Sequence, residues 1–307
     1  MSTSESSEAV ALKSSASDDV WMPRSSSRTE RVWQHPLARW GIIVLLAIIG
    51  FSFVGPSVYR ASAYTLHMTA LLQPPSARFP LGTNNLGRNM LARLMLGGQT
   101  SLEVGFAAAI AGMTIGVVYG LVAGYSGGFV DALMMRIVDM LRAIPGLFLL
   151  LFVDSVVRPS PLLLVFLIAG VSWHGVSRLV RGEVLRLRSE AYVEGAVSMG
   201  ASKGAIMRRY LFPNAIGTII VATTFAIADA ILAVAGLSFL GLGLPPPLPN
   251  WGAMLADSMA YLPQNAWWLV YPPGFMILLT VLFINFVGDG IRATFNTRRG
   301  GAERRGT

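Results

Sequence analysis

The chain contains no cysteine among its 307 residues, and only 13% of its residues are charged. The absence of cysteine excludes cysteine-ligated metal sites and thiol catalysis, and three scattered histidines do not make a metal site. A soluble domain is usually about 25% charged. The chain is instead 53% hydrophobic, which indicates a membrane protein.

Charge is missing in continuous blocks of 19 to 31 residues. Because about 20 apolar residues cross a bilayer as a helix, these blocks predict five spans, near residues 38–59, 100–123, 159–178, 212–236 and 265–288. A sixth span is predicted over 131–157, although its first half carries Arg136, Asp139 and Arg142. The predicted fold is an all-α polytopic membrane protein with about six transmembrane helices.

The basic residues predict the orientation of these spans. With six spans and both termini in the cytoplasm, the cytoplasmic segments hold 18 of the 24 Lys and Arg residues, whereas the segment 243–270 holds none. This agrees with the preference of cytoplasmic loops for Lys and Arg, and the segment 60–98, with four arginines, is the exception. The net charge of +8 is therefore explained by orientation and by anionic lipid, and no nucleic-acid partner is predicted.

The regions outside the spans are also predicted from composition. Residues 1–30 are Ser-rich without periodicity and predict a disordered cytoplasmic tail rather than a signal peptide. Residues 31–297 form the membrane domain, and 298–307 form a basic cytoplasmic tail. Residues 86–94 predict an amphipathic helix on the outer membrane surface. An aromatic belt at the outer surface is predicted from Trp251, Trp267, Trp268 and Tyr271.

The segment 190–214 is the most informative part of the chain. A short helix from Ala191 should carry small residues at Gly195 and Ala196, and Gly200 should end it or supply a positive-φ cap. Ser202 is a suitable N-cap for a second helix, and Pro213 marks the entry to the fifth span. The segment thus predicts two short helices around a glycine hinge. Its apolar ridge either docks on a partner or packs on the chain's own spans.

This segment resembles the EAA loop of ATP-binding-cassette importer permeases, with matches at Glu194, Gly200 and Pro213 and with Gly195 in place of the first Ala. Further segments resemble the C-type permease of dipeptide and oligopeptide importers, and the likeness covers roughly residues 33–297. These segments are 79–105, 124–145, 178–196, 237–255 and 286–297. The chain departs from this pattern at Gln99, where Arg is common, and at Val234, where Glu is often found.

The resemblance implies that the chain is the permease subunit of a peptide importer in a bacterial inner membrane, not an enzyme, with no cofactor. Its implied partners are a second homologous permease, two ATPase subunits, an extracytoplasmic substrate-binding protein, the peptide and membrane lipid. No phosphate-binding loop is present, since residues 200–204 do not fit GxxxxGK[ST]. The residues implied to contact the ATPase are Glu194, Gly195, Ala196, Gly200, Ala201, Ser202 and Pro213.

Alternatives to this interpretation remain open at the level of sequence. A related permease for nickel or a haem-like cargo would share these motifs. An ATP-independent channel or secondary transporter would leave the 191–214 segment unexplained. A membrane enzyme would need a cluster of acid, base or nucleophile, for which Asp139, Asp229 and His174 are too scattered.

Ionisable residues within the spans are candidates for the translocation pathway, because such residues are costly in lipid. Asp139 can pair with Arg136 or Arg142, so that these charges either line the pathway or form a structural ion pair. Asp229 is alone in the fifth span and either faces the channel or pairs with a neighbour. His174 is expected at the membrane interface rather than as a ligand.

Overall fold

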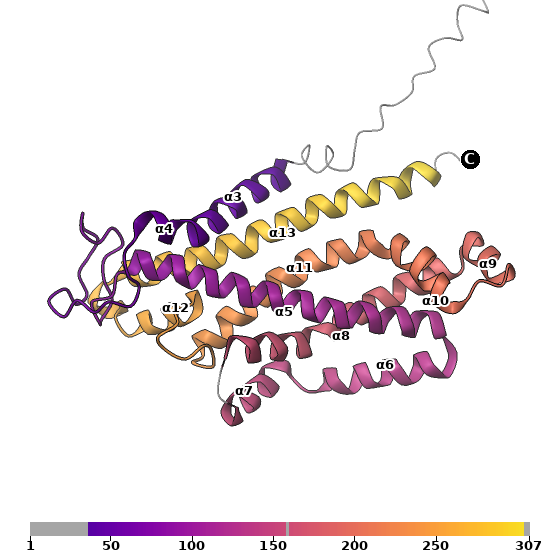
Figure 1. Ribbon diagram of the computed structural model, residues 1–307, viewed down its shortest axis with the longest axis horizontal. Coiled ribbons are helices and arrows are strands. Elements are labelled where there is room, and N and C mark those ends of the chain that lie inside the picture. The colour runs from indigo at the N-terminus through magenta and orange to yellow at the C-terminus, as the bar shows by residue number, and fades with distance from the viewer. Residues whose placement is uncertain (1–35, 158–159, 304–307) are drawn as a thin grey trace, which may run out of the picture.

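The computed structural model describes residues 36–157 and 160–303, and regular structure in these ranges is helical (Figure 1). The predicted tail 1–30 and residues 304–307 lie outside the described residues. The helices are α3 (Pro36–Phe53), α4 (Gly55–Tyr59), α5 (Met90–Ser126), α6 (Gly128–Ala143), α7 (Gly146–Val156), α8 (Pro161–Arg188), α9 (Ala191–Ser198), α10 (Lys203–Ile206), a π-helical turn (Met207–Leu211), α11 (Phe212–Phe239), α12 (Trp251–Met259), a 3₁₀ turn (Leu262–Gln264) and α13 (Trp267–Glu303).

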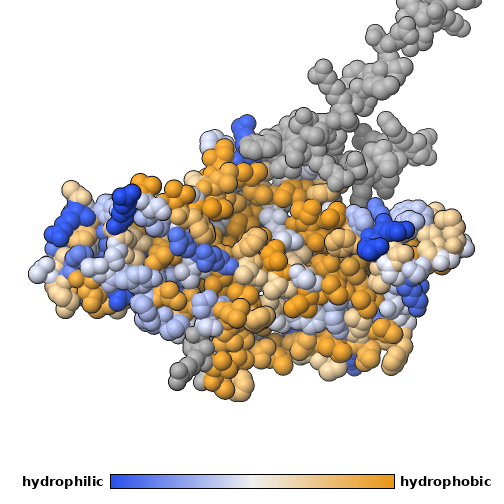
Figure 2. Space-filling model, viewed as in Figure 1, coloured by the Kyte–Doolittle hydropathy of each residue, from blue (hydrophilic) through white to orange (hydrophobic). Residues whose placement is uncertain are grey.

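The described residues contain five helices that are long and apolar enough to cross a membrane. They are α3, α5, α8, the continuous stretch Lys203–Phe239 and α13, and they confirm the five spans predicted from uncharged blocks. These helices run along the long axis of the molecule (Figure 1). Hydrophobic residues gather over the middle of the visible face and hydrophilic ones over its two ends (Figure 2), as expected for a protein that spans a bilayer.

The predicted sixth span is not one helix. The segment forms α6, of 16 residues, and α7, of 11 residues, separated at Ile144 and Pro145. Ile144 adopts an extended conformation with φ −86° and ψ 120°, because a following proline disfavours the helical region for the residue before it. Pro145 therefore divides the segment into two separate helices.

Helix α5 packs closely on α8 through glycines spaced four residues apart. Gly112, Gly116, Gly120 and Gly124 lie on one face of α5, and an added Cβ at any of them would come within 2.5–2.9 Å of an atom of α8. Small residues let two membrane helices approach until their backbones touch. This glycine face fixes α5 against α8, and the four-residue spacing of its glycines is a signal that the sequence carries.

The end of the bundle that carries α12 differs from prediction. Met90 and Leu94 belong to the membrane-crossing helix α5 and are buried against Trp251, so residues 86–94 do not form a surface helix. Trp251 is 0% exposed and donates its indole N–H to the Leu94 carbonyl at 3.0 Å. The aromatic belt predicted at the outer membrane surface is therefore wrong for Trp251 and for Trp268, because both side chains are buried. The other two aromatic residues, Trp267 and Tyr271, are exposed.

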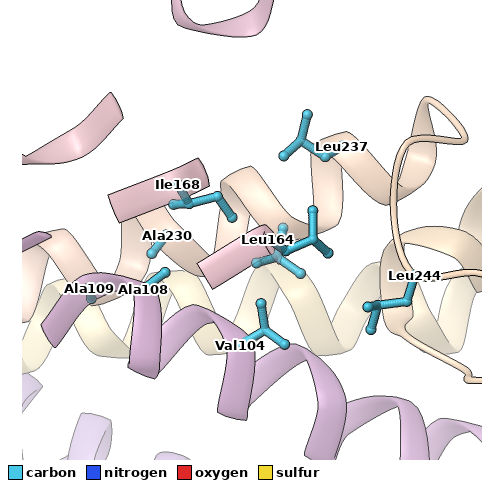
Figure 3. Close-up of a cluster of buried hydrophobic side chains, with 9 residues drawn as sticks. Val104, Ala108, Ala109, Leu164, Ile168, Ala230, Leu237 and Leu244 are labelled. Atoms are coloured by element: carbon cyan, nitrogen blue, oxygen red, sulfur yellow. The ribbon is translucent and has the colours of Figure 1, made fainter. Parts of the chain in front are cut away.

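The centre of the bundle is an apolar cluster shared by α5, α8 and α11 (Figure 3). Val234 lies in this cluster and is 0% exposed, so its apolar side chain suits a position where a carboxylate would be desolvated. Gln99 joins α5 to α3, since its side-chain amide donates to the Ser52 carbonyl at 2.8 Å. Helix α13 continues to Glu303, so residues 298–303 of the predicted basic tail are helical.

Candidate functional site

The segment 190–214 lies at one end of the bundle, where α8 passes into α9 and the chain returns through α10 to α11 (Figure 1). Two short helices flank Gly200, as predicted. The segment is joined directly to two membrane-crossing helices, because Glu190 follows closely on α8 and the π-helical turn runs into α11 without interruption. Helix α9 therefore lies on the chain between two membrane-crossing helices, α8 and α11.

Gly200 ends α9 in the conformation that a glycine favours. Its φ is +79°, its N–H donates to the Val197 carbonyl at 2.9 Å, and the Ala201 N–H donates to the Ala196 carbonyl at 3.1 Å. This pair of hydrogen bonds is the Schellman motif, in which the residue after the helix adopts the left-handed conformation. The positive-φ cap predicted for Gly200 is confirmed, and Ala196 and Ala201 take part in the same motif.

The second helix of the segment begins at Ser202, as predicted. The Ser202 hydroxyl accepts a hydrogen bond from the Ala205 N–H at 3.3 Å. Beyond α10 the helix widens into a π-helical turn, and the Phe212 N–H reaches back to the Met207 carbonyl. Pro213 accounts for this turn, because its missing N–H and its ring disrupt the hydrogen bonds of the turn before it.

Helix α9 has an inner and an outer face. Val193 and Ala196 are each 1% exposed, and Val193 packs in a cluster with Val184 of α8 and Leu211 before α11. The resemblance to the EAA loop implies that Ala196 contacts an ATPase, and in this structure the Ala196 side chain is covered by the chain's own helices. The sequence did not reveal which side of so short a helix would be covered.

The outer face of α9 is exposed and largely apolar. Tyr192, Val197 and Met199 are 43%, 54% and 80% exposed, and Glu194 and Gly195 lie beside them, also exposed. A monomer rarely leaves such an apolar patch uncovered at a polar end. The inner face thus packs on the chain's own helices, which was one of the two alternatives from the sequence, while the outer face remains open.

Charged side chains surround the start of α9. Arg186 of α8 forms hydrogen-bonded ion pairs with Glu183 at 2.9 Å and with Glu190 at 3.0 Å. Tyr192 stacks on Tyr210 with ring centroids 6.5 Å apart. Partial burial raises the pKa of Tyr192 above its ordinary value, and the negative charge of Glu190 adds to the shift. These contacts hold α9 in one orientation relative to α8.

Helix α6 is attached to α8 by two ion pairs. Asp131 accepts hydrogen bonds from Nε and Nη2 of Arg181 at 2.5 and 2.6 Å, and Asp139 pairs with Arg178. The local pairing of Asp139 with Arg136 or Arg142 is therefore wrong, because α8 brings a competing arginine alongside. The sequence could not show that these two pairs of residues, 39 and 50 positions apart along the chain, would meet in this way.

The remaining pathway candidates are not brought together. Arg142 is exposed in the last turn of α6, and Asp229 is exposed on α11. Among the residues that the structure describes, no ion pair or hydrogen bond involves the Asp229 side chain. His174 is half-buried on α8, near the charge of Arg142. The described ranges contain no group of three or more His, Cys, Asp and Glu residues that could hold a metal ion.

Comparison with known proteins identifies the family. Residues 116–300 match the family described as "Binding-protein-dependent transport system inner membrane component". The chain is 36% identical to the dipeptide transport system permease protein DppC of Bacillus subtilis over 91% of this chain and 88% of that one. It is 36% identical to the oligopeptide transport system permease protein OppC of the same organism over 85% and 86%. Identity to OppC of Haemophilus influenzae is 33% over 85% of each chain.

A solved structure supports the same fold. One chain of the MetNI methionine ABC transporter, in an inward-facing conformation, is 20% identical and superposes with a TM-score of 0.56. The match covers 67% of this chain and 97% of that one. At this identity the likeness concerns the fold alone, whereas the sequence matches extend over most of the chain. The chain therefore belongs to the family of binding-protein-dependent transport system inner membrane components and is a polytopic, all-α permease subunit.

Proposed function

We propose that the chain is the translocation-pathway subunit of an ATP-binding-cassette importer for dipeptides or oligopeptides. The peptide cargo is supported by the relatives, which are named as dipeptide and oligopeptide permeases. The dependence on ATP is supported by the outer face of α9. That face is largely apolar and uncovered. The segment that carries α9 is joined to α8 and α11, two of the helices that build the apolar centre of the bundle.

The proposed assembly contains a second homologous permease, two ATPase subunits and an extracytoplasmic substrate-binding protein in a bacterial inner membrane. Helix α9 and both termini lie on the cytoplasmic side in this arrangement. The distribution of charge supports this orientation, because Arg186, Arg188, Arg208 and Arg209 lie near α9 while residues 243–270 carry no Lys or Arg. The ATPase contacts are assigned to the outer face of α9.

Coupling requires an element that both the motor and the pathway can bias. The buried Val193 anchors α9 between α8 and the start of α11, so a push on Met199 or Val197 is transmitted through packed side chains. Gly200 and Ser202 keep α9 at a fixed angle to α10 through their caps. ATP-driven closure of the two ATPases would then move α11 and α8, together with the α5 that is packed on α8, and change access to the pathway.

A cross-linking experiment tests the docking face. The chain has no native cysteine, so Val197→Cys and Met199→Cys each introduce one thiol on the outer face. Ala196→Cys is the matched control, because it lies on the same helix but is 1% exposed. We expect Val197→Cys and Met199→Cys to cross-link to a cysteine-bearing ATPase subunit, with a yield that changes with ATP, and Ala196→Cys to remain unreacted.

The same cross-linking experiment can refute the proposed docking face. If neither outer-face cysteine cross-links in a correctly assembled complex, α9 is not the docking element. Leu71→Cys supplies a second control, since Leu71 is 46% exposed in the segment that joins α4 to α5 and should give no cross-link to the ATPase. ATP-dependent uptake of a radiolabelled dipeptide into proteoliposomes tests the cargo. Uptake that is absent with peptides but present with another solute would refute the peptide assignment.

A further inference from the structure

A cavity of about 790 Å³ opens at the end of the bundle opposite α9. It is bounded by the segment before α5, the first turn of α5, the proline-rich segment after α11, and α12. Its polar lining residues are Asn84, Asn85, Arg88, Arg93, Ser238, Asp257 and Tyr261. Binding sites for small molecules have volumes of about 300–1,000 Å³ and combine apolar walls with a few polar groups.

Arg93 is the most unusual residue of this cavity. It belongs to the first turn of α5, is only 6% exposed, and its Nη1 atom has no hydrogen-bond partner among the described residues. The Nε atom of Arg88, on the same wall, is also buried without a partner. Leaving a buried charged donor unpaired is costly. Both arginines line the cavity, and no hydrogen bond or ion pair joins either guanidinium group to an acceptor among the described residues, which indicates an anionic group that the chain itself does not supply.

Asp257 does not fill that role. It lines the same cavity from α12, but no ion pair within 4.0 Å joins it to Arg88 or Arg93 in the described part of the chain. Partial burial raises the pKa of Asp257 above its ordinary value, and the charges of Arg93 and Arg88 act against this shift. The cavity thus presents two guanidinium groups and one carboxyl group that are near one another without being joined.

We propose that this cavity is a binding subsite for the carboxylate of a short peptide, held by the guanidinium groups of Arg93 and Arg88, which both line it. Guanidinium groups bind carboxylates through parallel, charge-assisted hydrogen bonds. Asp257 lies within the same cavity and offers a carboxyl group to the amino end of the peptide. This assignment rests on the proposed peptide import, and it places cargo recognition in the permease in addition to the binding protein.

The test uses the assembled transporter in lipid nanodiscs without the binding protein. Leu248 lines the cavity and is 39% exposed, so Leu248→Cys accepts an environment-sensitive fluorophore in a chain that has no other cysteine. The complex is titrated with dialanine and with dialanine amide, which lacks the carboxylate. We expect dialanine to bind about 10- to 100-fold more tightly than the amide, the range given by charge-assisted hydrogen bonds.

Substitutions identify the residue responsible. Arg93→Gln should abolish the preference for dialanine over its amide, and Arg93→Lys should retain only part of it, because lysine cannot donate two parallel hydrogen bonds. Arg78→Gln is the matched control, since Arg78 is exposed in the segment before α5 and does not line the cavity. If Arg93→Gln does not assemble, Arg88→Gln replaces it with the same expectation.

Three results would overturn the proposal. Equal affinity of the wild-type complex for dialanine and its amide would show that the cavity does not recognise the carboxylate. A preference for dialanine that survives both glutamine variants would show that the arginines do not bind it. A fluorescence response to the peptide-free binding protein alone, with none to dialanine, would assign the subsite to a protein carboxylate. Peptide uptake by the wild-type transporter, measured in parallel, separates failure of this subsite from failure of the proposed function.

Discussion

Replacement of Gly120 by alanine tests how closely α5 and α8 are packed. An added Cβ at Gly120 would lie 2.5 Å from the Ser177 carbonyl oxygen and 2.8 Å from Cβ of Val180. Ordinary contacts begin near 3.4 Å, so the two helices would have to separate by about 1 Å. The nearest obstacle is a backbone atom, which cannot move away by a change of rotamer.

The magnitude follows from two opposing effects. Overpacking a tight interface costs about 1–3 kcal/mol, whereas alanine improves on glycine in a helix by about 1 kcal/mol. Gly182→Ala is the matched control, because Gly182 lies in α8 and has no atom within 4 Å of its added Cβ. The helix-propensity gain is common to both variants. Their difference in unfolding free energy should therefore be about 1–3 kcal/mol, with Gly120→Ala the less stable.

Thermal unfolding of the assembled complex measures this difference. Each variant carries a fluorescent fusion on this chain, and the fraction that remains in the complex peak after heating is read by size-exclusion chromatography. We expect the midpoint for Gly120→Ala to lie on the order of 2–10 °C below that for Gly182→Ala. A midpoint for Gly120→Ala equal to or above that of Gly182→Ala would refute the close packing of α5 on α8.

Three further changes test other parts of the structure. Gly200→Ala should cost about 1–2 kcal/mol through its left-handed backbone, and Gly200→Pro should leave ATP hydrolysis without peptide uptake; normal uptake in the proline variant would contradict coupling through α9. A double-mutant cycle of Asp131→Asn and Arg181→Gln, followed by thermal unfolding, should give a coupling of about 1–3 kcal/mol, and additive effects would refute their pairing. Trp251→Phe should lower the unfolding midpoint by removing a buried hydrogen bond, whereas the exposed Trp267→Phe should leave it unchanged.

The five confirmed spans were predictable because their signal is local. An uncharged block of 19 residues or more has to be a helix in lipid whatever its neighbours are. The caps at Gly200 and Ser202 were predictable for the same reason, since positive φ and an N-cap hydroxyl depend on residues only a few positions apart. The sequence predicted the two short helices around Gly200 but not which face of α9 is exposed.

Two of the predictions that the structure overturns concern contacts between distant segments. Asp139 was expected to pair within its own helix, yet α8 brings Arg178 beside it. Trp251 was expected at the membrane surface, yet α5 offers it the buried carbonyl of Leu94. In both cases a residue distant in sequence provides a better partner than the local surroundings. No periodicity within one segment can reveal such a partner.

The sequence by itself determined the helical class, the five spans, the family and the caps of the 190–214 segment, because each depends on local composition, spacing or likeness. Only the tertiary structure decided that Ala196 faces inward, that α6 is held by α8, and that the buried Arg93 lines a cavity without a partner for its Nη1 atom among the described residues. The physical reason is that burial and pairing depend on which helices become neighbours, and the packing of the whole bundle determines these neighbours.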